Sequence, residues 1–244
     1  MVGNDRASQI YVKNKSKACE EIGIEYEEHL LDENSSQRDL IKQIENLNND
    51  KTIHGILLQS PIPEHLDINE AFKTILPEKD VDGFNPVNVG KLCLNQETFV
   101  SCTPYGIMKM FEEYDIDLTG KNVTILGRSN IVGKPLIQCC LNKNATVTVC
   151  HSHTAAMETL AGEADILVAA MGRPEKVTSS MVKPGAVIID VGIHRVNGKT
   201  VGDVDFADVS TVAGALTPVP GGVGSVTTTM VVDAIVSEAE KRMK

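Results

Sequence analysis

The sequence has 244 residues, 42% hydrophobic and 23% charged, which is ordinary for a soluble globular protein with room for two compact domains or one large one. Its formal net charge of −10 argues against a nucleic acid or an anionic membrane as the main partner. No apolar run approaches the length of a membrane span, and the six cysteines form no C-x-x-C pair, so we expect reduced thiols in a cytoplasmic protein.

The first predicted element is a helix that starts after Asp5 or Ser8 and runs to about Ile22. Residues at i, i+4, i+7, i+8 and i+11 share one side of this helix and predict its buried face: Tyr11, Lys15, Ala18, Cys19 and Ile22. Lys15 is therefore a cation on a stripe that should be buried. By periodicity alone, the simplest interpretation is a lysine whose ammonium reaches solvent at the edge of that face.

Strands and helices then alternate along the chain. Residues 24–31 and 53–58 are predicted strands, and Ser36–Asp39 resembles a capping box that opens a helix. Alternation of this kind predicts an α/β fold with a mainly parallel sheet, whose ligands gather beyond the carboxyl ends of the strands. Gln59 lies at such an end. The following loop holds Asp82 beside a glycine, where acids are most often turn residues.

A glycine-containing turn is the most informative local pattern. After a helix that starts at Cys102, residues 123–126 predict a buried strand that turns at Gly127 and enters a helix at Gly133. Such a turn presents backbone N–H groups and the positive end of the helix dipole to a phosphate. The Gly-x5-Gly spacing is not the full dinucleotide fingerprint, so an α/β domain with unrelated loops stays an alternative.

The end of the next strand favours NADP over NAD. Residues 145–150 form a second β-rich run, and an NAD-binding fold would place an acid just after it. This chain has His151-Ser152-His153-Thr154 there, without a carboxylate to repel a 2′-phosphate. Arg128 and Ser152 could both hydrogen-bond such a phosphate.

The remaining segments complete the predicted order of elements. Strands are expected near 166–170 and 187–191, followed by Gly192-Ile193, a glycine- and proline-rich crossing at 217–224 and a final helix. The histidines show no convincing metal-ligand spacing, so no metal site is expected.

Five separated motifs occur in a fixed order: Ala7-Ser8-Gln9-Ile10-Tyr11-Val12-x-x-Lys15, Gly55-Ile56-Leu57-Leu58-Gln59, Lys79-Asp80-Val81-Asp82-Gly83-Phe84, Gly127-Arg128-Ser129-x-Ile131-Val132-Gly133-x-Pro135 and Pro218-Val219-Pro220-Gly221-Gly222-Val223-Gly224. In this order they resemble the bifunctional methylenetetrahydrofolate dehydrogenase/methenyltetrahydrofolate cyclohydrolase family over nearly the whole chain.

The resemblance implies two α/β domains with a folate-binding cleft between them. Residues 1–102 would form the substrate and catalytic domain, with the C-terminal helix of residues 225–244 packing back on it, and residues 103–224 would form a Rossmann-type NADP-binding domain. The implied enzyme oxidises 5,10-methylenetetrahydrofolate with NADP and hydrolyses the methenyl product to 10-formyltetrahydrofolate. A homodimer is also implied.

The resemblance also implies roles for particular residues. Lys15 would be the catalytic lysine, and Gln59 would orient it. Tyr11 would close over the folate, and Asp82 would hold the pterin ring. Cofactor contacts would come from Gly127, Arg128, Ser129, Ser152 and Ile193. Further substrate contacts would come from Leu58, Ser60, Pro220, Gly221, Gly222, Val223, Gly224 and Thr227.

The chain also departs from the family's pattern. Ser60, Ser101 and Ser225 stand where the family usually has Leu, Pro and Pro, which bears on folate affinity. Family members also carry a further helix and strand before the point where this sequence starts. These departures leave open a catalytically impaired NADP- or folate-binding protein. A third alternative, an NADP oxidoreductase with a non-folate substrate, would not need the set of Tyr11, Lys15, Gln59 and Asp82.

Overall fold

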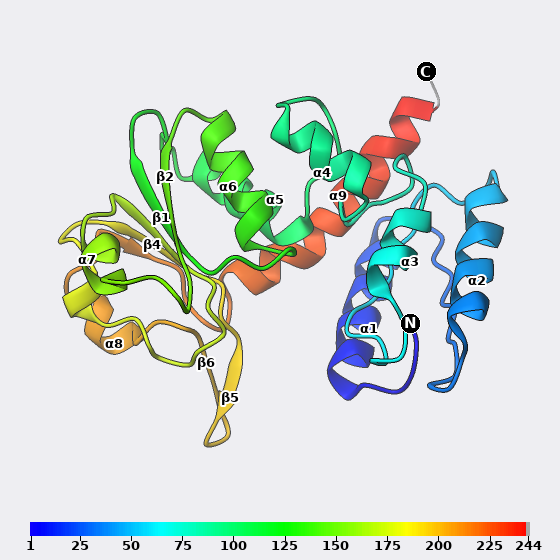
Figure 1. Ribbon diagram of the computed structural model, residues 1–244, viewed down its shortest axis with the longest axis horizontal. Coiled ribbons are helices and arrows are strands. Elements are labelled where there is room, and N and C mark those ends of the chain that lie inside the picture. Colours follow the sequence, from blue (N-terminus) through cyan, green and yellow to red (C-terminus); the bar gives the residue numbers. More distant parts are fainter. Residues whose placement is uncertain (243–244) are drawn as a thin grey trace. The chain divides into compact units, whose positions relative to one another are not determined.

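The chain folds into two units. The computed structural model describes residues 1–242, and the side chains of all of these except Ala7, Lys241 and Arg242. The first unit combines Met1–Cys102 with the chain from Thr228 onward, and the second unit is Thr103–Thr227. The expected C-terminal helix is present as α9 (Val223–Arg242), whose first residues belong to the second unit (Figure 1). Residues 243–244 of that prediction lie outside the described residues.

Helices dominate the first unit. Apart from its part of α9, they are α1 (Arg6–Glu21), α2 (Gln37–Asn49), α3 (Ile68–Thr74) and α4 (Pro86–Cys93). The predicted capping box is confirmed, because the Ser36 hydroxyl accepts the Asp39 N–H at 3.2 Å and the Asp39 carboxylate accepts the Ser36 N–H at 3.1 Å. Local sequence therefore sets the start of α2. Residues from the N-terminus, from α2 and α3, and from the segments next to these helices form a core: Val2, Leu40, Ile44, Ile56, Leu58, Leu66, Ala71 and Ile75.

The two strands expected in this unit do not form as continuous ladders. Residues 24–31 and 53–58 lie outside regular elements, and each makes an isolated parallel bridge, Val2 with Leu31 and Ile56 with Asp80. The bridge residue Val2 is soon followed by α1, and the bridge residue Asp80 is soon followed by the turn at Gly83. A ladder cannot lengthen where its partner chain turns away, so the prediction of full strands was wrong here.

The buried face of α1 also differs from the predicted stripe. Tyr11 is 41% exposed and Ile22 is 55% exposed, whereas Ser8, Val12 and Cys19 are buried. The face in contact with the unit is therefore displaced along the helix surface toward Ser8 and Val12. The periodic pattern correctly placed Cys19 on the buried face but put Tyr11 there instead of Val12. Neighbouring residues are about 100° apart around a helix, so a shift of one residue moves the predicted face to an adjacent side.

The second unit is built on a five-stranded parallel sheet with the order β2-β1-β3-β4-β7. Its strands are β1 (Asn122–Leu126), β2 (Thr146–Cys150), β3 (Ile166–Ala169), β4 (Val187–Asp190) and β7 (Ala215–Leu216). The connecting helices are α5 (Cys102–Glu113), α6 (Gly133–Asn142), α7 (Met157–Gly162), the 3₁₀ turn η1 (Ser179–Met181) and α8 (Phe206–Val209). The α/β prediction and the strands expected near residues 145–150, 166–170 and 187–191 are confirmed.

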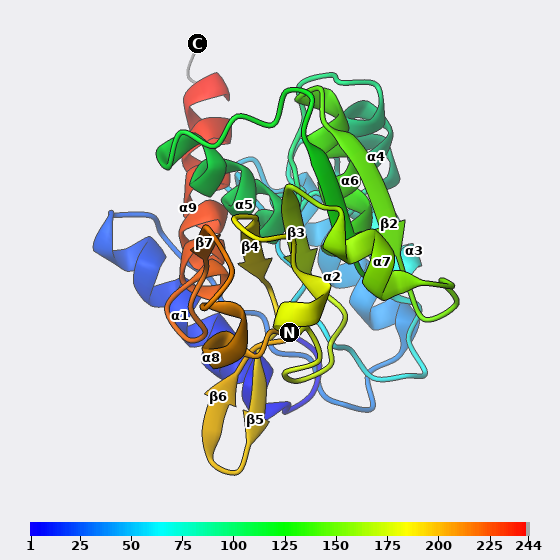
Figure 2. The same cartoon turned by 90° about the vertical axis from the view of Figure 1, so that its left-hand side faces the viewer.

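A hairpin that the sequence analysis did not predict follows β4. Strands β5 (His194–Val196) and β6 (Lys199–Val201) pair antiparallel and project from the sheet (Figure 2). Asn197 and Gly198 connect them with φ of 49° and 79°. Positive φ at both central residues is the geometry of a type I′ turn, for which Asn-Gly is the strongest short-range signal.

Gly127 and Gly133 allow the turn from β1 into α6 to close tightly. Gly127 has φ of +129°, and a Cβ on it would collide with the carbonyl oxygen of Ala170, at the end of β3. A Cβ on Gly133 would collide with the carbonyl oxygen of Gly127. Both positions therefore need glycine for backbone packing, as in dinucleotide-binding turns where glycine allows close helix–strand contact.

Candidate active site and cofactor site

Lys15 belongs to a polar cluster within the first unit. Its ammonium donates a hydrogen bond to Oε1 of Gln59 at 3.2 Å. The Gln59 amide nitrogen donates to the Ser60 carbonyl at 2.8 Å, so the amide is fixed with its oxygen toward Lys15. The buried hydroxyl of Ser8 donates to the same carbonyl at 3.3 Å. Lys15 is half-buried and its ammonium is bound by Gln59, an interaction that periodicity alone did not suggest.

Asp82 lies next to this lysine. Burial raises the pKa of the Asp82 carboxyl, and the positive charge of Lys15 opposes that rise. The Cys102 thiol donates to Oδ1 of Asp82 at 3.5 Å and to the Val81 carbonyl at 3.6 Å. Burial also raises the pKa of this thiol, so Cys102 keeps its proton and remains a donor. The cluster therefore combines one cation and one acid with a fixed amide and a protonated thiol.

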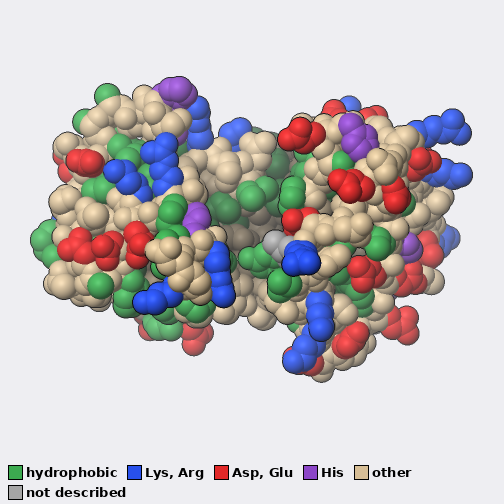
Figure 3. All heavy atoms as spheres, turned by 90° about the horizontal axis from the view of Figure 1, so that it is seen from below, with side chains coloured by type: hydrophobic (Ala, Val, Ile, Leu, Met, Phe, Trp, Pro, Cys, Tyr) green, Lys and Arg blue, Asp and Glu red, His purple; other side chains and the backbone are tan. Residues whose placement is uncertain are grey.

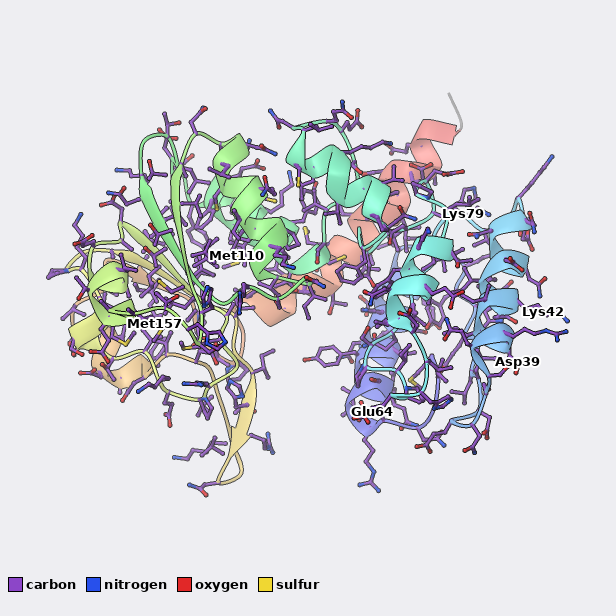
Figure 4. All side chains as sticks on the ribbon, in the orientation of Figure 1. Asp39, Lys42, Glu64, Lys79, Met110 and Met157 are labelled. Atoms are coloured by element: carbon purple, nitrogen blue, oxygen red, sulfur yellow. The ribbon has the colours of Figure 1, made fainter. Side chains whose placement is uncertain are left out.

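Buried charges hold the chain that leads to Asp82. The ammonium of Lys79, a residue only 4% exposed, reaches the carboxyl end of α2, opposite the capping residue Asp39 (Figure 4). There it donates to the carbonyls of Leu47 at 2.9 Å, Asn48 at 2.8 Å and Asp50 at 2.6 Å. A cation at the end of a helix dipole satisfies carbonyls that the helix leaves open. Lys79 thereby anchors the loop on which Asp82 lies.

The other residues expected to bind substrate in this unit have mixed exposure. Tyr11 lies one helical turn before Lys15 on α1 and is 41% exposed, so its ring is available to a ligand. Leu58 is buried in the core, and Ser60 is half-buried beside Gln59. The structure thus brings the predicted set of this unit together around the Lys15–Gln59 hydrogen bond.

The predicted cofactor residues of the second unit lie after β1 and β2. Because β1 pairs with β2 on one side and with β3 on the other, the order of the sheet reverses at β1. Ligands of open α/β sheets bind at such a switch point, beyond the carboxyl ends of the strands. Leu126 pairs with Cys150, so the exposed residues Arg128 and Ser152 each follow that pair by two positions on adjacent strands.

Ser129 shapes the entrance to α6. Its hydroxyl accepts the N–H groups of Val132 at 3.2 Å and Gly133 at 3.4 Å. The turn is thereby ordered by its own side chain, while Arg128 and Ser129 remain exposed. The N–H groups of Val132, Gly133 and Lys134 all bind Ser129, so the exposed Arg128 side chain and the positive end of the α6 dipole are what this turn offers to a phosphate.

The same unit has a pocket of about 130 Å³ that is lined by Ile193 and by residues 218–224 of the glycine-rich crossing. Ile193 is 51% exposed, and a Cβ at Gly224 would lie 3.0 Å from its Cδ1 atom. Gly224 therefore makes room for the Ile193 side chain. The predicted residues Pro220, Gly221, Gly222, Val223 and Gly224 line this pocket with Ile193. Thr227 is not among the lining residues; its hydroxyl contacts that of Thr103 at 3.2 Å.

Acidic and basic side chains are interspersed over the face of the molecule shown in Figure 3. Among the described residues, no helix is long and apolar enough to cross a membrane.

Taken together, the parallel sheet, the glycine turn at its switch point and the lysine–amide–acid cluster define a nucleotide-dependent oxidoreductase with a separate polar site for proton chemistry. Comparison with known families agrees with this class. Residues 1–82 match the tetrahydrofolate dehydrogenase/cyclohydrolase catalytic domain, and residues 101–243 match the NAD(P)-binding domain of the same family. The chain therefore belongs to the tetrahydrofolate dehydrogenase/cyclohydrolase family.

Individual relatives support the same assignment. The bifunctional protein FolD of Acetivibrio thermocellus is 51% identical, over 100% of this chain and 86% of its own. A crystal structure of the bifunctional FolD enzyme from Campylobacter jejuni is 47% identical, with a TM-score of 0.97, over 99% of this chain and 86% of its own. The Trypanosoma brucei FolD, crystallised with NADP and an inhibitor, is 35% identical with a TM-score of 0.95, over 100% of this chain and 86% of its own.

Sequence reasoning missed several polar residues around these sites. Ser8 and Cys102 were noted only as helix-start residues, although both contact the Lys15 cluster through hydrogen bonds. Asp190, Asp203 and His194 were not singled out either. An acid near the carboxyl end of an apolar predicted strand, as Asp190 is in residues 187–191, was a usable signal for a functional network at that edge of the sheet.

Proposed function

We propose that this protein is a bifunctional enzyme that oxidises 5,10-methylenetetrahydrofolate with NADP and hydrolyses the resulting methenyl compound to 10-formyltetrahydrofolate. The observation that carries the proposal is the Lys15–Gln59 hydrogen bond of 3.2 Å beside the partly buried acid Asp82. A lysine held by an amide next to an acid has no role in dinucleotide binding. It is the arrangement needed for proton transfer on a bound ring system.

The first step needs positioning more than it needs a base. The methylene carbon lies between N5 and N10, whose electrons drive the departure of hydride, and bound NADP supplies the hydride acceptor. Asp82 binds the pterin by accepting hydrogen bonds from its amino and ring N–H groups, and Tyr11 covers the ring system. Cys102 and Lys79 keep Asp82 in place, the first by its thiol and the second by anchoring the preceding loop.

The second step adds water to the cationic methenyl carbon and opens the five-membered ring. As the general base, Lys15 takes a proton from the attacking water and returns it to the nitrogen that leaves, while the remaining hydroxyl proton is released to solvent as the formyl C=O forms. Gln59 holds the amine in position through its Oε1 atom, while the Ser60 carbonyl prevents the amide from turning over. Lys15 and Gln59 thus serve the hydrolysis, and Asp82 serves both steps.

The Lys15→Met variant tests this division of roles. Methenyl hydrolysis should fall by a factor on the order of 10²–10⁴, the usual loss for a general acid or base. Oxidation should fall less, so methenyl-folate should accumulate and be visible by its absorbance during turnover. Asp82→Ala should instead weaken both activities together.

Two results would count against the proposal. If Lys15→Met hydrolyses methenyl-folate within a few-fold of the parent rate, Lys15 does not have the assigned role. If the parent shows neither activity, the chain is the catalytically impaired binding protein that the sequence had left open.

NADP is the cofactor we propose. The support comes from the exposed Arg128 and Ser152 at adjacent strand ends and from the absence of an acid in the segment 151–154. Gly127 and Ser129 form the phosphate turn, and Ile193 forms part of the wall for the nicotinamide end.

Two further proposals concern the state of the protein in the cell. All six cysteines are free, five of them buried, which supports a reducing, cytoplasmic location. A homodimer is proposed on the resemblance to the family alone, with folate and NADP as the small-molecule partners.

A further inference from the structure

Two loops border the proposed cofactor site at the carboxyl edge of the sheet. One follows β3 and includes residues 171–173, and the other follows β4 and carries Ile193. Because β3 and β4 are adjacent parallel strands, the two loops leave the sheet side by side. Residues 171–173 contain no regular element, and the segment with Ile193 is only the short link from β4 to the hairpin strand β5, so the side chains that tie these segments together help to decide their positions.

Asp203 ties the two loops together. It is fully buried, and its Oδ2 atom accepts the N–H groups of Met171 at 2.7 Å and Gly172 at 3.0 Å. Its Oδ1 atom accepts the N–H of Arg173 at 2.8 Å and Nε2 of His194 at 2.7 Å. Since a carboxylate only accepts, Nε2 of His194 must carry the proton. One carboxylate therefore binds three successive backbone donors of the first loop and the side chain of His194, the first residue of β5, which directly follows Ile193.

Asp190 extends the network into the pocket wall. Its Oδ1 atom accepts the N–H groups of Gly192 at 3.0 Å and Asp203 at 2.9 Å, and its Oδ2 atom accepts that of Val204 at 3.0 Å. A Cβ at Gly192 would collide with Asp203, so the two segments touch directly. Ile193 lies between Gly192, bound to Asp190, and His194, bound to Asp203.

We propose that Asp203 is a positioning residue for the bound dinucleotide and that it acts through His194 and the loop of residues 171–173. It sets the distance between Ile193 and the strand-end loop opposite, and so the width of the space for the cofactor. This inference rests on the proposed use of NADP. It does not involve Lys15, Gln59 or Asp82, so the hydrolytic step should not depend on it.

The Asp203→Asn variant is the most direct test. Both oxygens accept N–H groups, so either orientation of an amide sets its NH₂ group against at least one donor. The Kd for NADPH, followed by nucleotide fluorescence, should rise by about tenfold or more, as expected when a hydrogen bond to a charged group is replaced by a repulsive contact. The KM for NADP should rise in parallel, while hydrolysis of added methenyl-folate without nucleotide should stay within about twofold of the parent.

A second pair of variants keeps the test independent of the folding of Asp203→Asn. His194→Ala removes one contact of Asp203 from a side chain that is 20% exposed, and should raise the Kd for NADPH by a few-fold. His194→Gln can again donate from its amide nitrogen, and should restore most of the affinity. Recovery with glutamine separates a specific hydrogen bond from a general loss of packing.

Asp208→Asn is the matched control. Asp208 also accepts a backbone N–H, that of Ser179 at 2.7 Å, but it lies outside the pocket lining. This variant should leave the Kd for NADPH unchanged.

The inference is overturned if Asp203→Asn binds NADPH like the parent, if both activities of Asp203→Asn fall equally, or if His194→Gln binds no better than His194→Ala. A parent that does not bind NADPH would instead overturn the proposed cofactor.

Discussion

Burial, the charge of Lys15 and the hydrogen bond from Cys102 all act on the pKa of the Asp82 carboxyl. Burial raises its pKa, and the charge of Lys15 lowers it, with burial the larger effect. A raised pKa means that the folded state binds the proton more tightly than the unfolded chain does. The resulting stabilisation is fully present below the ordinary pKa of 3.8 and is lost as the pH rises through the raised value.

Lys15→Met should therefore raise the pKa of Asp82 further. Without the neighbouring cation, only the lowering contribution of Cys102 still opposes burial. A titration of the Asp82 carboxyl ¹³C signal, assigned by its loss in Asp82→Asn, measures the change. Lys13→Met, on the exposed side of α1, is the control and should leave the titration unaltered. An unchanged or lower pKa in Lys15→Met would show that the lysine and the acid do not interact.

Ser152 is the residue at which cofactor choice should be most sensitive. Ser152→Asp should lower kcat/KM for NADP by about tenfold or more, because it places a like charge beside the 2′-phosphate. The value for NAD should be maintained or improved, since an acid at this position can bind the ribose hydroxyls. Ser152→Asn separates charge from size and should retain NADP preference. A parent enzyme that already favours NAD would contradict the assignment.

Sequence patterns identified many of the individual site residues, but they did not predict the contacts between residues that are far apart in the chain. Lys15 stood out as a charge on an apolar stripe, yet periodicity alone assigned it to solvent. Its partner Gln59 is 44 residues away, and Cys102 is 20 residues from Asp82. Only the resemblance to a family connected Lys15 with Gln59 and Asp82, and nothing in the sequence connected Asp203 with His194.

At the scale of elements, α9 packs against the segment that leads to Gln59. A Cβ on Gly55 would lie 2.6 Å from Cγ1 of Val81 and 3.3 Å from Cγ1 of Ile235. Val81 is buried and directly precedes Asp82. Three segments far apart in sequence therefore meet at Gly55, close along the chain to Gln59 on one side and to Asp82 on the other.

Gly55→Ala should consequently destabilise the protein by about 1–3 kcal/mol through overpacking. Gly90→Ala in α4 is the matched control, because its Cβ would meet nothing within 4 Å. That change should be neutral or stabilising by about 0.5–1 kcal/mol, since alanine is the better helix residue. Urea denaturation of the two variants measures the difference. Equal free energies of unfolding for the two variants would mean that the side chains around Gly55 move to accommodate the new methyl group without destabilising the protein.

Local signals predicted several elements, but they did not decide every one. The capping box, the turn at Gly127 and the strands of the parallel sheet follow from adjacent residues. The extended segments 24–31 and 53–58 look like strands locally, but the path of their partners decides whether a ladder forms. The hairpin at Asn197-Gly198 had a clear local signal and was overlooked.

At the scale of the whole molecule, we expect a homodimer. Sedimentation at micromolar concentration should give a mass of about twice 26.4 kDa. Dilution toward nanomolar concentration serves as the control, because a specific dimer should dissociate along a single binding curve. A mass near that of one chain at every concentration would refute the expectation.

The first unit is built from two stretches of chain that are separated by the whole of the second unit. On the ribosome, the contiguous stretch Thr103–Thr227 emerges entire, while the first unit still lacks the part of α9 that contacts Gly55. The nascent chain should thus hold a nucleotide-binding sheet before its lysine site is complete. Because Asp82 also belongs to the first unit and serves both steps, nucleotide binding would come first during synthesis, and both activities would appear only when that unit is complete.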